Sequence, residues 1–480
     1  MRRRGTSSPA ADGTQRSLPA WIAAATCALT AGSSAAAQDC SARPIGLLPL
    51  DDLHQGEYSG VEGGLYPGRS NQTPEEHLAA GKAIAKRIVS LDAAGNPAAD
   101  GSIVCASIGM SLTAQVYEGL RTALGGDPDI APELRLPGIA GNFVTLERIR
   151  DPDDSFWKQE VPDDLGAAGV TVEQVQVVWA MNAFAFVDED LPFPHHVPAG
   201  ADAWTDVLQL LHRTFPNLKL VFLSPLYSQA YSDAAPADEP YYFEQGFAIR
   251  EVVARQLAGA PELNYDPALG KVEAPWIDWG PYFWSDAEEP RTDGLSIACA
   301  DISPDGQHLE PTGKKKLGER LAQFLKSHRA CTRWATVKGT TPSERRADVE
   351  RIGDGTPGSR GEPRLCGGSL PTLPHEATYQ LLARGSRRRG NGLVLLGDSL
   401  DPGGGVPFAG GLIYVEIDTL LPIDFDNSGN GVLLLEPIPD DPALLGRSWY
   451  AQLVAYDRKG PDGTHALSAA IELALGDGDL

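Results

Sequence analysis

Apolar runs and helical patterns alternate along residues 102–330. Short segments that are apolar nearly throughout predict strands buried on both faces, and apolar residues at helical spacing predict helices that cover them. The predicted strands are 103–108, 175–181 and 218–224, and the predicted helices are 74–89, 113–124, 203–215, 241–257 and 312–326. This alternation indicates an α/β domain with a parallel sheet covered by helices on both faces.

The pattern changes after residue 335. Residues 336–365 are rich in Gly, Pro, Arg and Glu and hold few large apolar side chains, which is typical of a linker. From 366 to 480, short apolar runs are separated by Gly, Pro and Asp turns. These runs predict strands over 377–383, 393–396, 412–417, 432–435, 450–456 and 467–475. We therefore expect a small all-β sandwich domain at the C-terminal end.

The chain begins with features of a secretory signal peptide. Arg2, Arg3 and Arg4 precede an apolar stretch over 18–31, and Ala35-Ala36-Ala37 follows. A basic start, a short apolar core and a small-residue end predict cleavage after Ala37. An uncleaved anchor is the alternative, although the apolar core is short for one. We expect a secreted, periplasmic or cell-surface protein whose α/β domain, with an N-terminal extension, occupies 38–335.

Export would expose the cysteines to an oxidising compartment, where disulfides form. Cleavage leaves Cys40, Cys105, Cys299, Cys331 and Cys366. Because Cys105 lies in an apolar strand, we expect it to be a buried thiol. Cys299 with Cys331 is the first pairing to consider, although spacing does not determine connectivity. No C-x-x-C pair occurs, so a zinc or redox motif is not supported.

Composition narrows the class of protein further. The 480 residues include 64 Asp and Glu against 40 Lys and Arg, which gives a net charge of −24. This balance disfavours nucleic acid as a partner, because phosphate binding needs surplus positive charge. No apolar run in the body of the chain reaches about 18 residues, so no stable membrane span is expected there.

Two serines occur in sequence contexts that could produce a nucleophile. Ser399 stands in Gly-Asp-Ser-Leu, with Asp462 and His465 about 65 residues later. Ser111 stands in Gly-Met-Ser, after an apolar strand and before a helix. A nucleophilic serine needs such a strand-to-helix turn, where helix amides face the developing charge. Ser399 precedes Asp-Pro-Gly-Gly-Gly, which cannot begin a helix. We favour Ser111 and interpret Ser399 as a loop hydroxyl and His465 as a turn histidine.

Four more residues complete a candidate catalytic set with Ser111. Asp305 precedes His308 by three residues, so it can bond one ring nitrogen and direct the other toward a hydroxyl. Gly141 and Asn182 follow predicted strands and could turn an amide toward the serine. Each residue also has a structural alternative. Ser111 and Asp305 could cap helices, Gly141 could be a turn glycine, Asn182 could cap a strand end, and His308 could lie in a surface loop.

With these residues in this order, the segment 95–330 resembles the SGNH hydrolase superfamily, which includes the GDSL esterases. Residues 60–104 with Gly109-Met110-Ser111 also look like a group of exported bacterial members, and the C-terminal part looks like a β-sandwich appended to secreted bacterial proteins. The resemblance implies a flavodoxin-like sheet flanked by helices. The sequence departs from the superfamily pattern at Met110, where Asp is usual, and at 180–183, which lacks the Gly and Asp of Gly-x-Asn-Asp.

The resemblance also implies a mechanism. Ser111 would attack an ester carbonyl, His308 would take the serine proton, and Asp305 would orient His308. The backbone amides of Ser111 and Gly141, with the side chain of Asn182, would form the oxyanion hole. No cofactor or metal is implied. From the residues themselves, neither His195-His196 nor the turn over 424–430 offers a convincing metal-ligand set.

The substrate is expected to be a small acyl ester, with O-acetyl groups on carbohydrate as one possibility. Trp276, Trp279 and Trp284 lie shortly before the Asp–His loop and could form a sugar or acyl wall, or a core plug instead. The alternative function is a non-catalytic carbohydrate-binding or cell-surface interaction protein on the same fold. In either case the C-terminal domain, which carries no credible chemistry, is expected to act in surface attachment or interaction.

Overall fold

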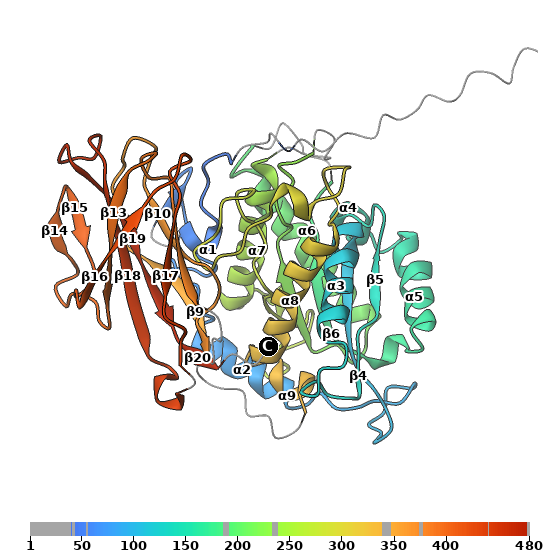
Figure 1. The fold of residues 1–480 in the computed structure, drawn as a ribbon. Coiled ribbons are helices and arrows are strands. Elements are labelled where there is room, and N and C mark those ends of the chain that lie inside the picture. The colour runs from blue at the N-terminus through green and yellow to red at the C-terminus, as the bar shows by residue number, and fades with distance from the viewer. Residues whose placement is uncertain are drawn as a thin grey trace, which may run out of the picture.

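A computed structural model of the chain describes residues 40, 44–53, 56–185, 192–232, 239–337, 347–373, 378–439 and 441–477. The expected signal peptide lies outside these residues. In the ranges just given, no helix is both long enough and apolar enough to cross a bilayer. The buried apolar side chains form one large core within residues 50–335 and a second within 349–475. The two cores correspond to the two parts of the molecule in Figure 1.

The first part is an α/β domain built on a parallel sheet. Its strand order is β4-β3-β6-β7-β8, and β5 also pairs with β3. The strands are β3 (Ile103–Met110), β4 (Leu134–Arg135), β5 (Gly138–Gly141), β6 (Val175–Met181), β7 (Leu220–Ser224) and β8 (Trp276–Trp279). Every residue of β6 and β7 is buried, which confirms the expectation of a sheet covered on both faces.

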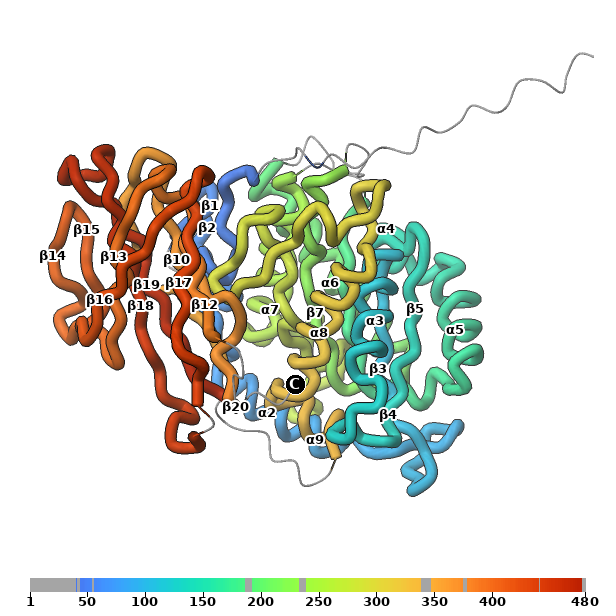
Figure 2. Tube along the Cα trace, in the orientation of Figure 1, coloured from blue at the N-terminus to red at the C-terminus, as the bar shows by residue number. Residues whose placement is uncertain are grey.

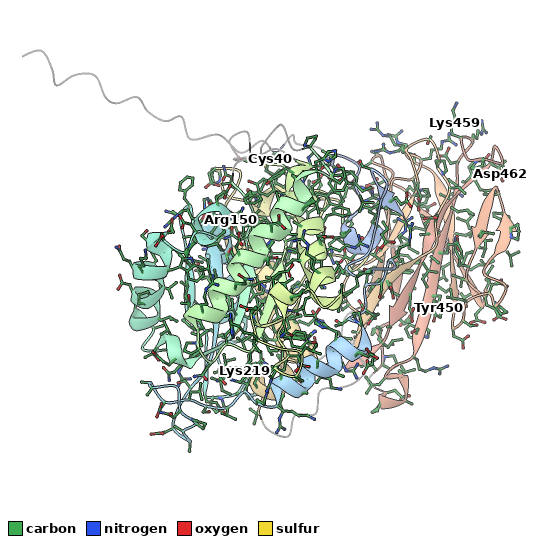
Figure 3. The ribbon with its side chains drawn as sticks, turned by 180° about the vertical axis from the view of Figure 1, so that it is seen from behind. Cys40, Arg150, Lys219, Tyr450, Lys459 and Asp462 are labelled. Atoms are coloured by element: carbon green, nitrogen blue, oxygen red, sulfur yellow. A yellow bond between two sulfur atoms is a disulfide. The ribbon has the colours of Figure 1, made fainter. Side chains whose placement is uncertain are left out.

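Helices cover both faces of this sheet. The helices are α1 (Leu50–Leu53), α2 (Glu75–Ala85), α3 (Ser111–Ala123), α4 (Leu146–Ile149), α5 (Val161–Ala167), α6 (His196–Thr214), α7 (Tyr241–Leu257), α8 (Pro311–Ser327) and α9 (Thr332–Ala335). Helices α3 and α8 lie in front of the sheet in Figure 1, and the green helices α6 and α7 come forward in the reverse view of Figure 3. A short hairpin of β1 (Glu57–Tyr58) and β2 (Val61–Glu62) precedes α2.

The second part consists of antiparallel sheets. A five-stranded sheet has the order β16-β13-β18-β19-β9, and a three-stranded sheet has the order β10-β12-β17. The strands are β9 (Asp348–Ile352), β10 (Arg364–Gly367), β12 (Tyr379–Arg384), β13 (Asn391–Gly397), β16 (Thr419–Asp424), β17 (Gly431–Leu435), β18 (Ser448–Tyr456) and β19 (His465–Ala474). Leu381 of one sheet and Leu453 of the other belong to the same core, so the two sheets pack face to face.

Two small strand pairs complete this part. A hairpin of β14 (Val406–Phe408) and β15 (Gly411–Ile413) lies against the five-stranded sheet, where Ile413 packs on Leu467. Strand β11 (Thr372–Leu373) pairs with β20 (Gly476–Asp477) in parallel.

The prediction of a linker over 336–365 is wrong in part. Strand β9 is an edge strand that pairs with β19, and β10 begins at Arg364. Most of the side chains of β9 are polar, and Val349 is its one buried residue. An edge strand needs apolar residues on only one face, so the many charged residues of this segment made it look like a linker.

The first pairing considered for the cysteines is also wrong. Cys299 forms a disulfide with Cys40, 259 residues away in sequence. Cys331 is a free thiol buried in the core near α9, as Cys105 is in β3. Burial raises the pKa of the Cys105 thiol to about 12, which confirms the inert buried thiol expected there. Disulfide partners are set by the distance between Cα atoms in the fold, and sequence spacing does not report that distance.

The two parts meet across polar contacts. On the α/β side of this boundary, Arg291 is buried and pairs with Asp51 at 2.5 Å and Asp293 at 3.1 Å. Burial raises the pKa of Asp51 to about 7, although the Arg291 charge acts to lower it. The amide of Gly367 in β10 donates to the carbonyl of Thr292 at 2.9 Å. Figure 2 shows the blue N-terminal segment in the region where the two parts of the molecule meet.

The closest helix contact in the α/β domain is between α3 and α8. A Cβ atom on Gly119 of α3 would lie 2.0 Å from the carbonyl oxygen of Lys314, and one on Gly318 of α8 would lie 2.2 Å from the Gly119 carbonyl carbon. The two helix backbones therefore touch, and only glycine at both positions allows that approach.

We expect Gly119→Ala to lower the free energy of unfolding by about 1–3 kcal/mol, because the added methyl group must push the two helices apart. Chemical denaturation of the purified protein measures this change. Gly166→Ala in α5 is the matched control, since a Cβ atom there meets nothing within 4 Å. It should leave stability unchanged or raise it by about 0.5–1 kcal/mol. Equal stability of Gly119→Ala and the wild type would contradict the proposed close contact.

Candidate active site

Ser111 lies at a sharp turn between β3 and α3. It is the first residue of α3, directly after the extended residue Met110. Gly109 has a φ of +156°, and a Cβ atom there would lie 2.3 Å from both Met181 O and Thr113 Oγ1. Thr113 donates a hydrogen bond to that same carbonyl of Met181. The turn therefore packs tightly against the end of β6 and presents Ser111 at the N-terminus of a helix.

The structure brings Ser111, His308 and Asp305 together. Ser111 Oγ lies 2.8 Å from His308 Nε2, although 197 residues separate the two in sequence. His308 Nδ1 lies 2.6 Å from Asp305 Oδ2. These distances form a continuous hydrogen-bond chain from hydroxyl to imidazole to carboxylate. In such a chain the imidazole can accept the hydroxyl proton while the carboxylate stabilises the imidazolium.

The loop that carries Asp305 holds its carboxylate in one orientation. Oδ1 accepts hydrogen bonds from Ser303 Oγ at 2.6 Å, from the Gln307 amide at 2.9 Å and from the His308 amide at 3.0 Å. This leaves Oδ2 for the imidazole. Partial burial acts to raise the pKa of Asp305, but the hydrogen bonds from Ser303, His308 and Gln307 outweigh it and hold that pKa well below its usual range.

Two side chains that the sequence analysis did not select also position the histidine. Gln115, one turn after Ser111 on α3, accepts a hydrogen bond from the Leu309 amide at 2.7 Å. Tyr227 donates to the carbonyl of Gln307 at 2.8 Å. Both contacts fix the loop next to His308. A glutamine four residues after a candidate nucleophile is on the same helix face, which is the one signal that could have indicated Gln115.

Gly141 and Asn182 lie at the carboxyl ends of the strands that flank β3. Met110 is in register with Gly141, and Gly109 is in register with Met181. Asn182 is buried, and its Nδ2 donates to the carbonyl of Val144 at 2.9 Å. The side chain therefore ties the loop after Gly141 to the end of β6. This bond uses one of the two hydrogens on the side-chain Nδ2 of Asn182.

The loop after Gly141 carries an exposed aromatic side chain. Phe143 is 71% exposed and has a φ of +56°. A bulky residue rarely adopts this left-handed conformation, and such backbone strain persists where surrounding contacts impose it. Here the Asn182–Val144 hydrogen bond holds the next residue of the loop. The strained loop thus presents a phenyl ring beside the Ser111 end of β3.

The three tryptophans do not line this site, which corrects the expectation of an aromatic wall. Trp276, Trp279 and Trp284 are buried, and their indole N–H groups donate to His77 O, Leu65 O and Glu239 Oε1 at 3.1, 2.9 and 3.1 Å. The first two lie in β8, a strand of the parallel sheet. The density of aromatic residues in this segment reflects core packing, which was the alternative interpretation.

Ser399 is not part of a catalytic set. Its hydroxyl donates to Glu416 at 2.9 Å in an exposed loop. It follows β13 at the end that pairs with Tyr450, whereas His465 pairs with Tyr456 at the far end of β18. Six residues of extended strand separate Tyr450 from Tyr456, which is about 20 Å. The structure thus keeps Ser399 and His465 at opposite ends of one sheet.

Comparisons with known proteins do not identify a family. No protein-family model matches the chain, and no curated protein matches it. Among solved structures, an engineered protein aligns over 83% of this chain and 97% of its own, with 11% identity and a TM-score of 0.20. Wild-type OgpA from Akkermansia muciniphila aligns over 82% of this chain and 96% of its own, with 10% identity and a TM-score of 0.13. In the described parts of the chain, no three His, Cys, Asp or Glu side chains form a group that could hold a metal ion.

We expect a fluorophosphonate to label Ser111, because a hydroxyl hydrogen-bonded to an oriented imidazole is an activated nucleophile. Intact-mass measurement should show one adduct, and peptide mapping should place it on Ser111. Ser399→Ala should be labelled as the wild type is, and Ser111→Ala should not be labelled. An adduct on Ser399, or none at all, would contradict the assignment.

Proposed function

We propose that this protein is a secreted serine esterase of the SGNH hydrolase type, acting on small acyl esters. The observation that carries the proposal is the hydrogen-bond chain from Ser111 through His308 to Asp305 at the N-terminus of α3. Secretion is supported by the signal-peptide pattern and by the Cys40–Cys299 disulfide, since disulfides persist in oxidising compartments.

The sheet topology supports the same proposal. Strands β4 and β5 pair with successive parts of β3 and count as one interrupted strand. Numbered along the chain in this way, the sheet has the order 2-1-3-4-5 of flavodoxin-like folds. In such sheets, ligands bind at the carboxyl ends of the strands where the order reverses, between the first and third strands. These strands are β3 and β6, and Ser111 and Asn182 follow them directly.

The proposed reaction proceeds through an acyl-enzyme. Ser111 Oγ attacks the ester carbonyl carbon while its proton passes to His308 Nε2, and Asp305 stabilises the imidazolium. The developing oxyanion is stabilised by amides at the start of α3 and by the loop of Gly141 and Asn182. His308 then gives its proton to the departing alcohol. Water attacks the acyl group on Ser111 by the same route, so that the carboxylic acid leaves and the hydroxyl is restored.

The exposure of the site supports a substrate carried on a larger molecule. The side chains of His308 and Asp305 are one third or more exposed, so the reacting atoms lie near the protein surface. Phe143, on the neighbouring loop, offers an aromatic face for stacking against a sugar ring. We therefore propose O-acyl groups on carbohydrate as the substrate class, with acetyl esters as the simplest case.

We expect Ser111→Ala to lower kcat for p-nitrophenyl acetate, and for acetate release from acetylated xylan, by at least about 10³-fold. The melting temperature should change little, because Ser111 is only partly buried and the substitution removes a single hydroxyl group. Ser399→Ala is the matched control and should keep full activity. Full turnover by Ser111→Ala would overturn the proposal, and no turnover of any ester by the wild type would favour the non-catalytic binding alternative.

We expect Phe143→Ala to raise KM for acetylated xylan about 5- to 10-fold, because an aromatic contact contributes about 1 kcal/mol. Turnover of p-nitrophenyl acetate should be nearly unchanged, since this small ester has no sugar to stack on the ring. Leu269→Ala is the control: Leu269 is 78% exposed in the segment before β8, at the amino end of the strand. An equal loss of activity on both substrates would indicate that Phe143 acts on the catalytic loop and not on the sugar.

A further inference from the structure

The five-stranded sheet has a hollow on its outer face, far from Ser111 in the fold. The hollow has a volume of about 510 Å³, within the range of about 300–1,000 Å³ that is usual for small-ligand sites. Residues of β13, β16, β18 and β19 line it. Nothing in the proposed esterase reaction uses this surface.

The floor of the hollow is apolar. Leu393 of β13 pairs with Pro422 of β16 on one side and with Val454 of β18 on the other, so these three side chains lie side by side on one face of the sheet. Leu393 is 41% exposed. Pro422 is exposed as well, whereas Val454 is buried, so the exposed apolar floor spans β13 and β16. A ligand with an apolar face would cover it.

Aromatic rings stand at one end of this floor. The ring of Tyr456, at the end of β18, lies 6.1 Å from the imidazole of His465 at an angle of 84°. The ring of Phe408 in β14 lies 5.5 Å from the same imidazole, and Phe408 is 39% exposed. Aromatic faces of this kind stack against the C–H faces of sugar rings.

His465 is held in a fixed orientation. Its Nδ1 lies 3.0 Å from Asp462 Oδ2 and 2.8 Å from Thr464 Oγ1. Asp462 Oδ1 also accepts the backbone N–H of His465. The Asp-x-x-His turn thus orients the imidazole as the turn of Asp305 does, but no serine stands opposite. Among the described residues no hydrogen bond to Nε2 is present, so this nitrogen is free to bond a ligand hydroxyl.

The rim of the hollow carries a carboxylate and a side-chain amide. Asp424 pairs with Asn391 across β16 and β13, and both line the hollow. An anionic ligand would be repelled by the carboxylate of Asp424. The rim therefore disfavours an anionic ligand, and its amide, carboxylate, phenol and imidazole suit the hydroxyl groups of a neutral one, which both donate and accept hydrogen bonds.

We propose that this hollow binds a neutral carbohydrate chain, whose rings cover Leu393 and stack on Tyr456 while hydroxyl groups bond His465 and Asp424. Binding here would hold the α/β domain near polysaccharide and raise the local concentration of esters on it. The proposal does not depend on Ser111 being catalytic.

Affinity electrophoresis of the whole secreted chain tests this proposal, with soluble arabinoxylan, glucomannan or mixed-linkage β-glucan in the gel. We expect retardation by at least one of these neutral polysaccharides. Tyr456→Ala should raise the dissociation constant at least tenfold. Tyr450→Ala is the matched control, because Tyr450 is a tyrosine of the same strand six residues away; Figure 3 shows it well apart from Asp462, which lies beside the hollow. Ser111→Ala should bind as the wild type does.

His465→Gln is a second variant, because a surface imidazole can be replaced without disturbing the core. It should weaken binding at least threefold with an unchanged melting temperature, even if Tyr456→Ala proves unstable. Absence of retardation by all three polysaccharides would overturn the proposal. So would retention by anionic polygalacturonate alone, or equal losses in Tyr450→Ala and Tyr456→Ala. If the wild-type protein binds polysaccharide but turns over no ester, the result contradicts the proposed esterase activity and supports the proposed binding site.

Discussion

The contact between Gly119 and Gly318 is the constraint on which the rest of the candidate site depends. Helix α3 begins with Ser111, and α8 begins three residues after His308. Because the two helix backbones touch at these glycines, their N-terminal ends arrive at the same edge of the sheet. A hydroxyl and an imidazole separated by 197 residues then lie 2.8 Å apart. Gln115 reinforces this arrangement, since it reaches from α3 to the chain just before α8.

Around this contact, short-range hydrogen bonds orient the side chains of the candidate site. The Asp305 turn satisfies one carboxylate oxygen with its own backbone and leaves the other for His308. Asn182 holds the loop that carries Phe143. The strand positions are set by the parallel sheet, whereas the orientation of each functional side chain is set by one or two local bonds. Ser111, His308 and Asp305 are partly exposed, so the proposed reaction with an ester on a polymer would need no deep pocket.

The Asp-x-x-His turn occurs twice in this chain with nearly the same local geometry. In the α/β domain, Asp305 and His308 face Ser111; in the β-rich part, Asp462 and His465 face an aromatic surface. The turn itself only fixes the imidazole. What the imidazole can do depends on the group that the surrounding fold places opposite it: a hydroxyl at a helix N-terminus in one case, and an open apolar hollow in the other.

Local patterns in the sequence determined the strand over 175–181, the helix over 241–257 and the preference for Ser111 over Ser399, because hydrophobic periodicity and turn composition are properties of neighbouring residues. They did not reveal the edge strand β9, the Cys40–Cys299 disulfide or the exposure of Phe143, and they did not decide whether the three tryptophans are buried. Each of these features depends on which distant segment packs against the residue. Such packing is set by strand pairing, by the contact between α3 and α8 and by the loop held by Asn182. These contacts exist only once the chain has folded.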